Sequence, residues 1–121
     1  MGPDWFVGNT GGREFWTEER CYITELMNDP ASPDASLAIA RVEPGVTTQL
    51  HKLAGVSERY IVRKGRGVVE VDGVSHPLET GDQAVIPAGS AQRITNTGDT
   101  DLEFYCLCVP RFRPGSYVNL E

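Results

Sequence analysis

The sequence lacks any long hydrophobic run, and no apolar stretch among its 121 residues approaches the ~20 residues that span a bilayer. Basic residues are also scarce, since 11 Lys and Arg stand against 17 Asp and Glu and the net charge is −6. A nucleic-acid-binding surface needs clustered basic side chains. The two absences argue against membrane and nucleic-acid partners. Residues 1–12 lack the basic and apolar zones of a signal peptide, so we expect a cytoplasmic protein.

Cysteine is too scarce to form a disulfide framework. Cys21, Cys106 and Cys108 are odd in number, and the Cys-x-x-Cys pair typical of zinc sites is absent from the sequence. Cys106 and Cys108 share a face of one predicted strand, which is poor geometry for bridging distant elements. We therefore expect reduced core thiols. The alternative is a catalytic thiol, for which Arg20 beside Cys21 is the only adjacent positive charge.

Glycine and proline are frequent, with 13 Gly and 8 Pro, and they leave little space for long helices. Between them lie short segments rich in β-branched and aromatic residues, separated by turn signals such as Asp72-Gly73. Regular spacing of such segments is typical of a β-sandwich or barrel. We expect one all-β domain over residues 1–121. The predicted strands are Cys21–Leu26, Ser36–Glu43, Glu58–Arg63, Gly67–Asp72, Gln83–Pro87, Gln92–Asn96 and Leu102–Val109.

The two ends of the chain are expected to flank this barrel. Residues 1–20 form an N-terminal arm and residues 110–121, with two prolines, an extended C-terminal strap. The acidic pair Glu18-Glu19 is expected on a solvated face. Four aromatic side chains of the arm are expected to pack across the barrel or onto a partner subunit: Trp5, Phe6, Phe15 and Trp16.

The middle of the chain carries residue types suited to chemistry. A first segment is interpreted as a strand that ends at His51, a connection through Gly55 and a strand that starts at Glu58. Strand alternation puts Gln49 and His51 on one face. It also puts Glu58 and Tyr60 on one face, so neighbouring strands bring His51 and Glu58 together. We expect these four side chains in one pocket.

A second segment contributes a further polar group. Turns at Gly81 and at Pro87-x-Gly89 reverse the chain, and Gln92 and Asn96 then share a face of the next strand. We expect Gln92 to enter the same cavity as the imidazole of the first segment.

These two segments resemble the paired signature motifs of the cupin superfamily, in its small single-domain form. The first motif spaces a Gly, a His-x-His, a Glu and a Gly, and the second spaces a Gly, a Pro-x-Gly, a His and an Asn. The first is matched, with Leu at the second His, by Gly45, His51, Leu53, Glu58 and Gly65. The second is matched, with Gln at the His, by Gly81, Pro87, Gly89, Gln92 and Asn96. The resemblance implies an antiparallel jelly-roll β-barrel.

The resemblance also implies a metal held by the motif His and Glu residues. Here His51, Glu58 and Gln92 stand at ligand positions, whereas Leu53 cannot bind a metal. One imidazole and two oxygen donors would suit a single divalent ion such as Mn²⁺ or Fe²⁺, with Ni²⁺ and Zn²⁺ as further options. Because two of the four ligand positions have changed, a metal-free pocket is the alternative.

Each candidate residue also has a structural interpretation. His51 can be a barrel histidine that hydrogen-bonds a neighbour, and Glu58 can form an ion pair with an arginine such as Arg41. Tyr60 can simply pack. Asn96 is expected to satisfy backbone groups at a turn.

Three functions follow from these residues. The first is a metal-dependent enzyme acting on a small organic or sugar-like molecule, of the dioxygenase, isomerase or lyase type. The second is a metal-free module that binds or senses a small molecule. The third is a metal-free isomerase or epimerase in which His51 acts as base and Tyr60 as acid. The resemblance and the aromatic arm also predict a homodimer.

Overall fold

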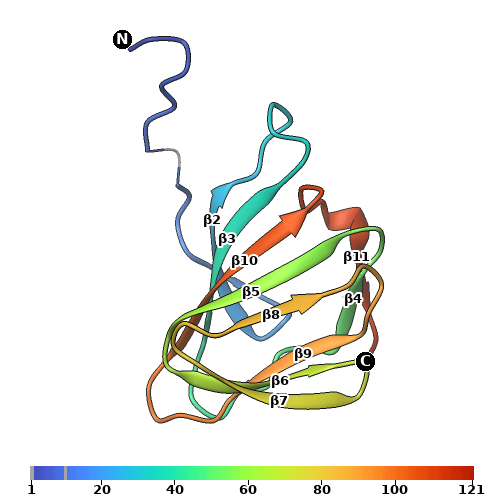
Figure 1. The fold of residues 1–121 in the computed structure, drawn as a ribbon. Coiled ribbons are helices and arrows are strands. Elements are labelled where there is room, and N and C mark those ends of the chain that lie inside the picture. The colour runs from blue at the N-terminus through green and yellow to red at the C-terminus, as the bar shows by residue number, and fades with distance from the viewer. Residues whose placement is uncertain (1, 10) are drawn as a thin grey trace.

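The computed structural model describes residues 2–9 and 11–121, which form short strands joined by tight turns. The two halves of the chain interleave, so that strands distant in sequence lie side by side (Figure 1). The elements are β1 (Phe15–Thr17), β2 (Cys21–Met27), β3 (Ser36–Val42), β4 (His51–Leu53), β5 (Ser57–Lys64), β6 (Arg66–Val71), β7 (Val74–Glu79), β8 (Gln83–Ile86), β9 (Gln92–Asn96), β10 (Leu102–Val109), the 3₁₀ turn η1 (Pro114–Ser116) and β11 (Tyr117–Asn119).

These strands build two antiparallel sheets that face each other. One sheet has the order β1-β2-β3-β10-β5-β8 and the other has the order β11-β4-β9-β6-β7. The predicted all-β jelly-roll barrel is therefore confirmed. All seven predicted strands are present, with boundaries within a few residues of those expected.

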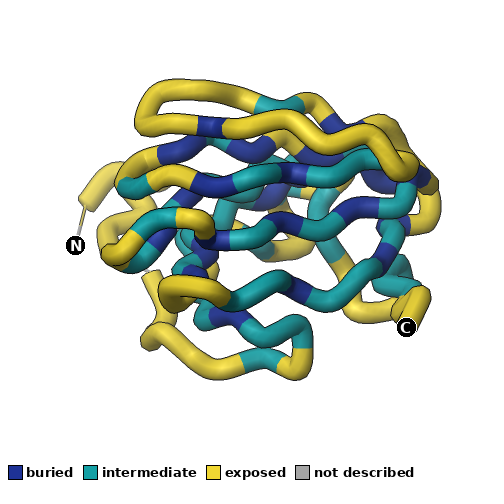
Figure 2. The backbone as a smooth tube through the Cα atoms, turned by 90° about the horizontal axis from the view of Figure 1, so that it is seen from below, coloured by how far each residue is buried: buried dark blue, intermediate teal, exposed yellow. Residues whose placement is uncertain are grey.

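Alternation of side chains along the strands creates the core between the sheets. Along β9 every second residue, from Gln92 to Asn96, is buried while those between are half-buried. Buried positions repeat in the same way on most strands, and the exposed residues gather in the turns and the arm (Figure 2). Three aliphatic side chains at the packed end of the barrel are fully buried, Val42, Ile94 and Leu102, and so is Ile86, which pairs with Glu58 of β5.

Two motif glycines are required by the backbone. Gly65 has a φ of 82°, and a Cβ there would lie 2.7 Å from the carbonyl oxygen of Asp101. Gly89 has a φ of 81° in the turn between β8 and β9. Side chains strain both conformations, which explains why glycine stands at these spacings.

The structure differs from the predicted strands at four places. His51 begins strand β4 instead of ending a strand. Three further strands were not predicted: β1 and β11, which have three residues each, and β7, which contains Pro77 and is largely exposed. Such short or exposed segments carry too little alternation to be recognised in a sequence.

The N-terminal arm does not pack across the barrel. In Figure 1 it extends away from the sheets, and Trp5 and Phe6 are 81% and 62% exposed. Phe15 and Trp16 instead belong to β1, where the Trp16 ring packs edge-on against Tyr22. The expected packing on this chain's own barrel was therefore wrong for Trp5 and Phe6, whereas Phe15 and Trp16 do pack on it.

Within residues 2–9 and 11–121, no helix has the length and apolar character needed to cross a bilayer.

Candidate functional site

A cavity of about 170 Å³ lies between the two sheets, at the end opposite the packed aliphatic core. Strands β2, β3, β5 and β10 supply one wall, and β4 and β11 supply the other. Three of the predicted site residues line it: His51, Glu58 and Tyr60. These three belong to the first motif segment, and none of the described lining residues comes from the second motif, contrary to expectation.

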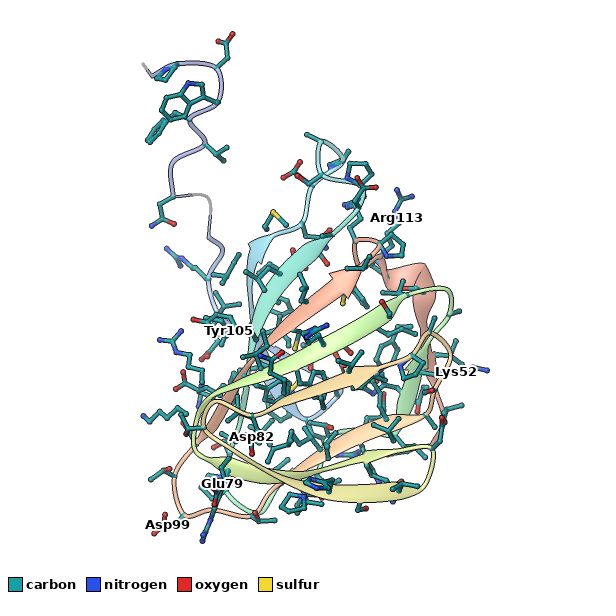
Figure 3. The ribbon with its side chains drawn as sticks, viewed as in Figure 1. Lys52, Glu79, Asp82, Asp99, Tyr105 and Arg113 are labelled. Atoms are coloured by element: carbon teal, nitrogen blue, oxygen red, sulfur yellow. The ribbon has the colours of Figure 1, made fainter. Side chains whose placement is uncertain are left out.

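His51 presents one ring nitrogen to the cavity as a hydrogen-bond acceptor. Lys52 points away from the barrel (Figure 3), so alternation turns its neighbour His51 inward, where it is 4% exposed. Its Nδ1 lies 2.7 Å from the carbonyl oxygen of Gln49. A carbonyl can only accept, so Nδ1 carries the hydrogen and Nε2 keeps its lone pair. Burial lowers the pKa of His51, which keeps the ring neutral.

Glu19 faces this imidazole, which contradicts the expectation that Glu18-Glu19 lie on a solvated face. Glu19 Oε1 is 3.7 Å from His51 Nε2, and the Glu19 side chain is only 28% exposed. Burial raises the pKa of Glu19 to about 7. The turn that carries Glu19 is held by Arg20, whose φ is 69° and whose Nε–H donates to the Thr47 carbonyl at 2.8 Å.

Glu58 is the most deeply buried carboxyl group of the cavity. It lies on β5 opposite Cys108 of β10, whose thiol is 3.5 Å from Glu58 Oε2. Glu58 is only 8% exposed, yet its Oε1 has no hydrogen-bond partner among the described residues. Burial, and to a smaller degree the nearby charge of Glu19, raises the pKa of Glu58 to about 7.

The expected ion pair between Glu58 and Arg41 does not form. The Arg41 guanidinium instead binds Glu14, at 2.6 and 2.9 Å, and Asp101 at 3.1 Å. These contacts lie on the outside of the barrel wall, because Arg41 alternates with the buried Ala40 and Val42.

Gln92 is buried beside the cavity without lining it. It lies directly opposite His51 in the pairing of β4 and β9 and is 1% exposed. Its Oε1 accepts a hydrogen bond from the Tyr60 hydroxyl. The Tyr60 proton is therefore committed to Gln92, and burial raises the pKa of Tyr60 further above its usual range. Tyr60 presents its ring, and not a free hydroxyl, to the cavity.

Gln49 also does not line the cavity, contrary to expectation. Its side-chain oxygen accepts the Tyr117 hydroxyl at 2.6 Å. Tyr117, on β11 in the C-terminal strap, in turn stacks on the His51 ring at a centroid distance of 4.7 Å. Tyr117 belongs to neither sequence motif, and the pairing of β11 with β4 brings it here.

All three thiols line the cavity as well. Cys21, Cys106 and Cys108 are free, as predicted, and the last two share the inner face of β10. Burial raises their pKa values, to about 12 for Cys21, so each thiol keeps its proton at neutral pH. They act as weak donors and apolar wall, since a nucleophilic cysteine needs a lowered pKa.

The donor set does not fit a divalent metal. Leu53 is buried at one motif ligand position, and the Gln92 oxygen at another already accepts a hydrogen bond. Within the described part of the chain, no three His, Cys, Asp or Glu side chains form a group that could hold a metal ion. Of the four motif ligand positions, only His51 and Glu58 remain as donors, and two donors are fewer than a stable site requires.

Known proteins are similar to this chain in sequence and in fold. The chain is 33% identical over 89 residues to an oxalate-binding protein of Thermotoga maritima, covering 72% of this chain and 74% of that protein. It is 31% identical over 111 residues to an uncharacterised protein of Methanocaldococcus jannaschii, covering 90% of this chain and 86% of that protein. The structure of Pac13, a nucleoside dehydratase of Streptomyces, superposes with a TM-score of 0.76 at 18% identity, covering 90% of this chain and 84% of that chain.

The family follows from a further match. The cupin domain family Cupin_2 matches residues 38–109, which include both motif segments and more than half of the chain. With the two-sheet barrel, this match confirms the resemblance seen in the sequence. The chain belongs to the cupin family.

Proposed function

We propose that this cupin is an isomerase- or lyase-type enzyme that transfers protons on a small organic molecule without a metal. The observation that carries this proposal is the facing pair in the cavity, where His51 Nε2 and Glu19 Oε1 lie 3.7 Å apart. A proton acceptor and a proton donor therefore stand side by side at a ligand-sized space. The contact is long for a hydrogen bond, as catalytic pairs often are before substrate binds.

The protonation states of His51 and Glu19 at neutral pH suit proton transfer. His51 is neutral and keeps its Nε2 lone pair, because Nδ1 donates to Gln49. Glu19 has a pKa of about 7, so a large share of the molecules carry its proton. An acid that titrates near the operating pH is effective in proton transfer, and a neutral imidazole has a free lone pair to accept a proton. Stacking by Tyr117 fixes the plane of the imidazole.

The reaction balances within the cavity. His51 Nε2 accepts a proton from a carbon of the substrate, and protonated Glu19 donates one to a neighbouring carbon or to a departing hydroxyl group. The first course isomerises the substrate, and the second releases water. The imidazolium then returns its proton to the Glu19 carboxylate across the 3.7 Å contact, which restores both groups.

A solvent-exchange experiment tests this proposal. Small hydroxycarbonyl compounds and sugar fragments are incubated with the protein in D₂O, and loss of carbon-bound protons is followed by NMR. We expect exchange with the native chain, and a rate at least ~100-fold lower for His51→Ala and Glu19→Gln. Glu18→Gln is the matched control, because Glu18 is exposed and outside the cavity. Exchange that survives both cavity substitutions would refute the assignment.

A binding module is the second candidate, favoured by the 33% identity to an oxalate-binding protein. It predicts that oxalate raises the melting temperature of the protein, with no turnover. Oxalate is a dianion and the cavity holds two buried carboxyl groups, Glu19 and Glu58. Comparing oxalate alone with oxalate plus Mn²⁺ tests this candidate, and no effect of either mixture would rule it out.

We further propose a homodimer formed through the arm. Trp5, Phe6 and Val7 are 81%, 62% and 73% exposed, an arrangement that burial against a second copy would relieve. Light scattering coupled to size exclusion measures the mass. A monomer at micromolar concentration would contradict the proposal.

A further inference from the structure

The walls of the cavity carry charge of one sign. Three carboxyl groups line it, from Glu25, Glu19 and Glu58, and among the described lining residues none is Lys or Arg. They follow one another inward, since Glu25 is exposed, the Glu19 side chain is 28% exposed and Glu58 is 8% exposed. The one basic side chain, His51, is kept neutral by burial. A positively charged ligand is attracted along this path and a negatively charged one is repelled.

An independent observation marks the inner end of the path. Glu58 is more than nine-tenths buried and lines the cavity, yet its Oε1 has no hydrogen-bond partner among the described residues. Gln92 and Cys106 lie close enough to lower the pKa of Glu58, but neither donates to Oε1 within hydrogen-bond distance, and leaving a buried acceptor without a hydrogen bond costs stability. A ligand that donates hydrogen bonds to Oε1 would supply it.

The neighbouring arginines do not take this role. Arg41 is held outside the barrel by Glu14 and Asp101. Arg111 donates to Asn28 at the cavity wall, at 2.9 Å, and is not a lining residue itself. The donor to Glu58 Oε1 is therefore not a guanidinium of this chain.

The rest of the wall suits an apolar body attached to a cation. Aromatic rings line the cavity on both sides of Glu58, with Tyr60 and Phe104 packed at a centroid distance of 4.6 Å. Phe15, Phe112 and Tyr117 add three more rings. Ring faces attract ammonium groups and shield them from water. A volume of about 170 Å³ is close to the ~150 Å³ that accommodates benzene in an engineered protein cavity, so the ligand has roughly six to eight heavy atoms.

We propose that the cavity binds a small primary amine whose ammonium group donates to Glu58 Oε1 and whose apolar body lies among the aromatic rings. Glu25 and Glu19 attract the cation toward the interior. The amine would occupy the same cavity as the substrate of the proposed function, and this shared cavity is the one point on which the two proposals depend on each other. Binding of the amine requires no proton transfer by His51.

Three similar probes test the charge of the ligand. Benzylamine and benzyl alcohol have the same shape and carry positive and no charge, so their difference isolates the charge, and the slightly larger benzoate carries negative charge. Binding is measured by calorimetry and by the shift in melting temperature, at neutral pH and with EDTA present. We expect benzylamine to bind most tightly and benzoate not to bind. Equal binding of the three probes, preference for benzoate, or no benzylamine binding at millimolar concentration would overturn the proposal.

Substitutions locate the ammonium group. Glu58→Gln keeps the shape and removes the charge, and we expect it to weaken benzylamine binding about tenfold or more while benzyl alcohol binding changes little. Glu18→Gln, outside the cavity, is the control and should leave the affinity unchanged. Circular dichroism and the melting temperature establish that each variant is folded. An unchanged benzylamine affinity in folded Glu58→Gln would overturn the placement.

The outcomes separate this proposal from the proposed function. His51→Ala should slow proton exchange at least ~100-fold, while the folded variant should still bind benzylamine more tightly than benzoate. Exchange lost together with retained charge preference supports both proposals, whereas exchange without any preference for the amine supports the catalytic pair alone. A divalent ion that displaces benzylamine after EDTA is removed would show that the carboxyl groups serve a metal, and would overturn the amine.

Discussion

The two ends of the barrel treat a buried polar motif residue in opposite ways. At the packed end Asn96 is 1% exposed, and every polar atom of its side chain has a partner. Its Nδ2 donates to the carbonyl oxygens of Val42 and Thr100 at 2.9 and 2.8 Å, and its Oδ1 accepts from the Gly98 amide at 2.8 Å. At the cavity end Glu58 has one weak thiol donor and one oxygen without a partner.

This difference separates structural from functional motif positions. The Asn96 side chain closes the turn between β9 and β10, as the sequence predicted, and its hydrogen bonds are complete within the chain. Glu58 keeps one oxygen, Oε1, without a hydrogen-bond partner among the described residues, and a group that enters the cavity could supply one. Native proteins leave few buried polar groups unpaired, so the exception points to a binding site.

The largest effect is expected at the packed end. Asn96→Ala removes one buried and two part-buried hydrogen bonds and leaves two carbonyl groups and one amide to find other partners. At about 1 kcal/mol for each bond, we expect the free energy of unfolding to fall by ~3 kcal/mol. Urea denaturation measures the change, and Asn9→Ala in the exposed arm is the control. A loss no greater than that of the control would remove the structural role of Asn96.

Much of this end of the barrel could be predicted from the sequence. Strands β3, β9 and β10 have clear alternation, and glycines such as Gly65 mark turns whose backbone only glycine adopts easily. The structural role of Asn96 followed from its place after an alternating strand. Local pattern was sufficient for these strands and turns, but it does not reveal that Asn96 also donates to Val42 of the other sheet, 54 positions away.

The cavity end could be predicted only in part. Motif spacing placed His51 and Glu58 together, but Glu19 was assigned to a solvated face. Its position depends on the left-handed residue Arg20 and on a contact between Arg20 and Glu121, which are 101 positions apart. No periodicity within a strand encodes such a contact. The commitment of Gln92 to Tyr60 was likewise invisible, since alternation gives the face of a side chain and not its hydrogen-bond partner.

The opposite sign is expected for the unpartnered carboxyl group. Glu58→Leu removes a buried acceptor that has no donor, so we expect the free energy of unfolding at pH 8 to rise by about 1 to 3 kcal/mol. The same urea titration measures it beside Glu18→Gln. A variant that is destabilised as strongly as Asn96→Ala would show that Glu58 is structural, and the contrast between the two ends would be lost.

The pH dependence of stability sharpens the same comparison. Folding raises the pKa of both Glu19 and Glu58 from an ordinary 4.5 to about 7, so the folded state holds these protons more tightly than the unfolded state. Their contribution to stability is complete below about pH 4.5 and is lost as the pH rises through 7. We expect the melting temperature to fall between pH 5 and pH 8, and each of Glu19→Gln and Glu58→Gln to flatten the curve. A slope that survives in the double variant would assign it to other groups.

The smallest effect on stability is expected at the strap beside the cavity, where a substitution should instead change local motion. Arg20 binds the Glu121 carboxylate through two nitrogens at 3.0 and 2.7 Å, and Glu121 Oε2 also accepts the Leu50 amide at 2.7 Å. These contacts fasten β11, and with it Tyr117, against the strand that carries His51.

The Arg20 and Glu121 side chains are both exposed to solvent, so their pairing adds little to global stability. Glu121→Gln should therefore leave the melting temperature almost unchanged and speed amide hydrogen exchange in residues 117–119. The pair of Arg63 and Glu103 provides the control, because Glu103→Gln breaks an ion pair between β5 and β10, away from the strap. Unchanged exchange in β11 would mean that the β4–β11 pairing alone holds Tyr117 over the imidazole.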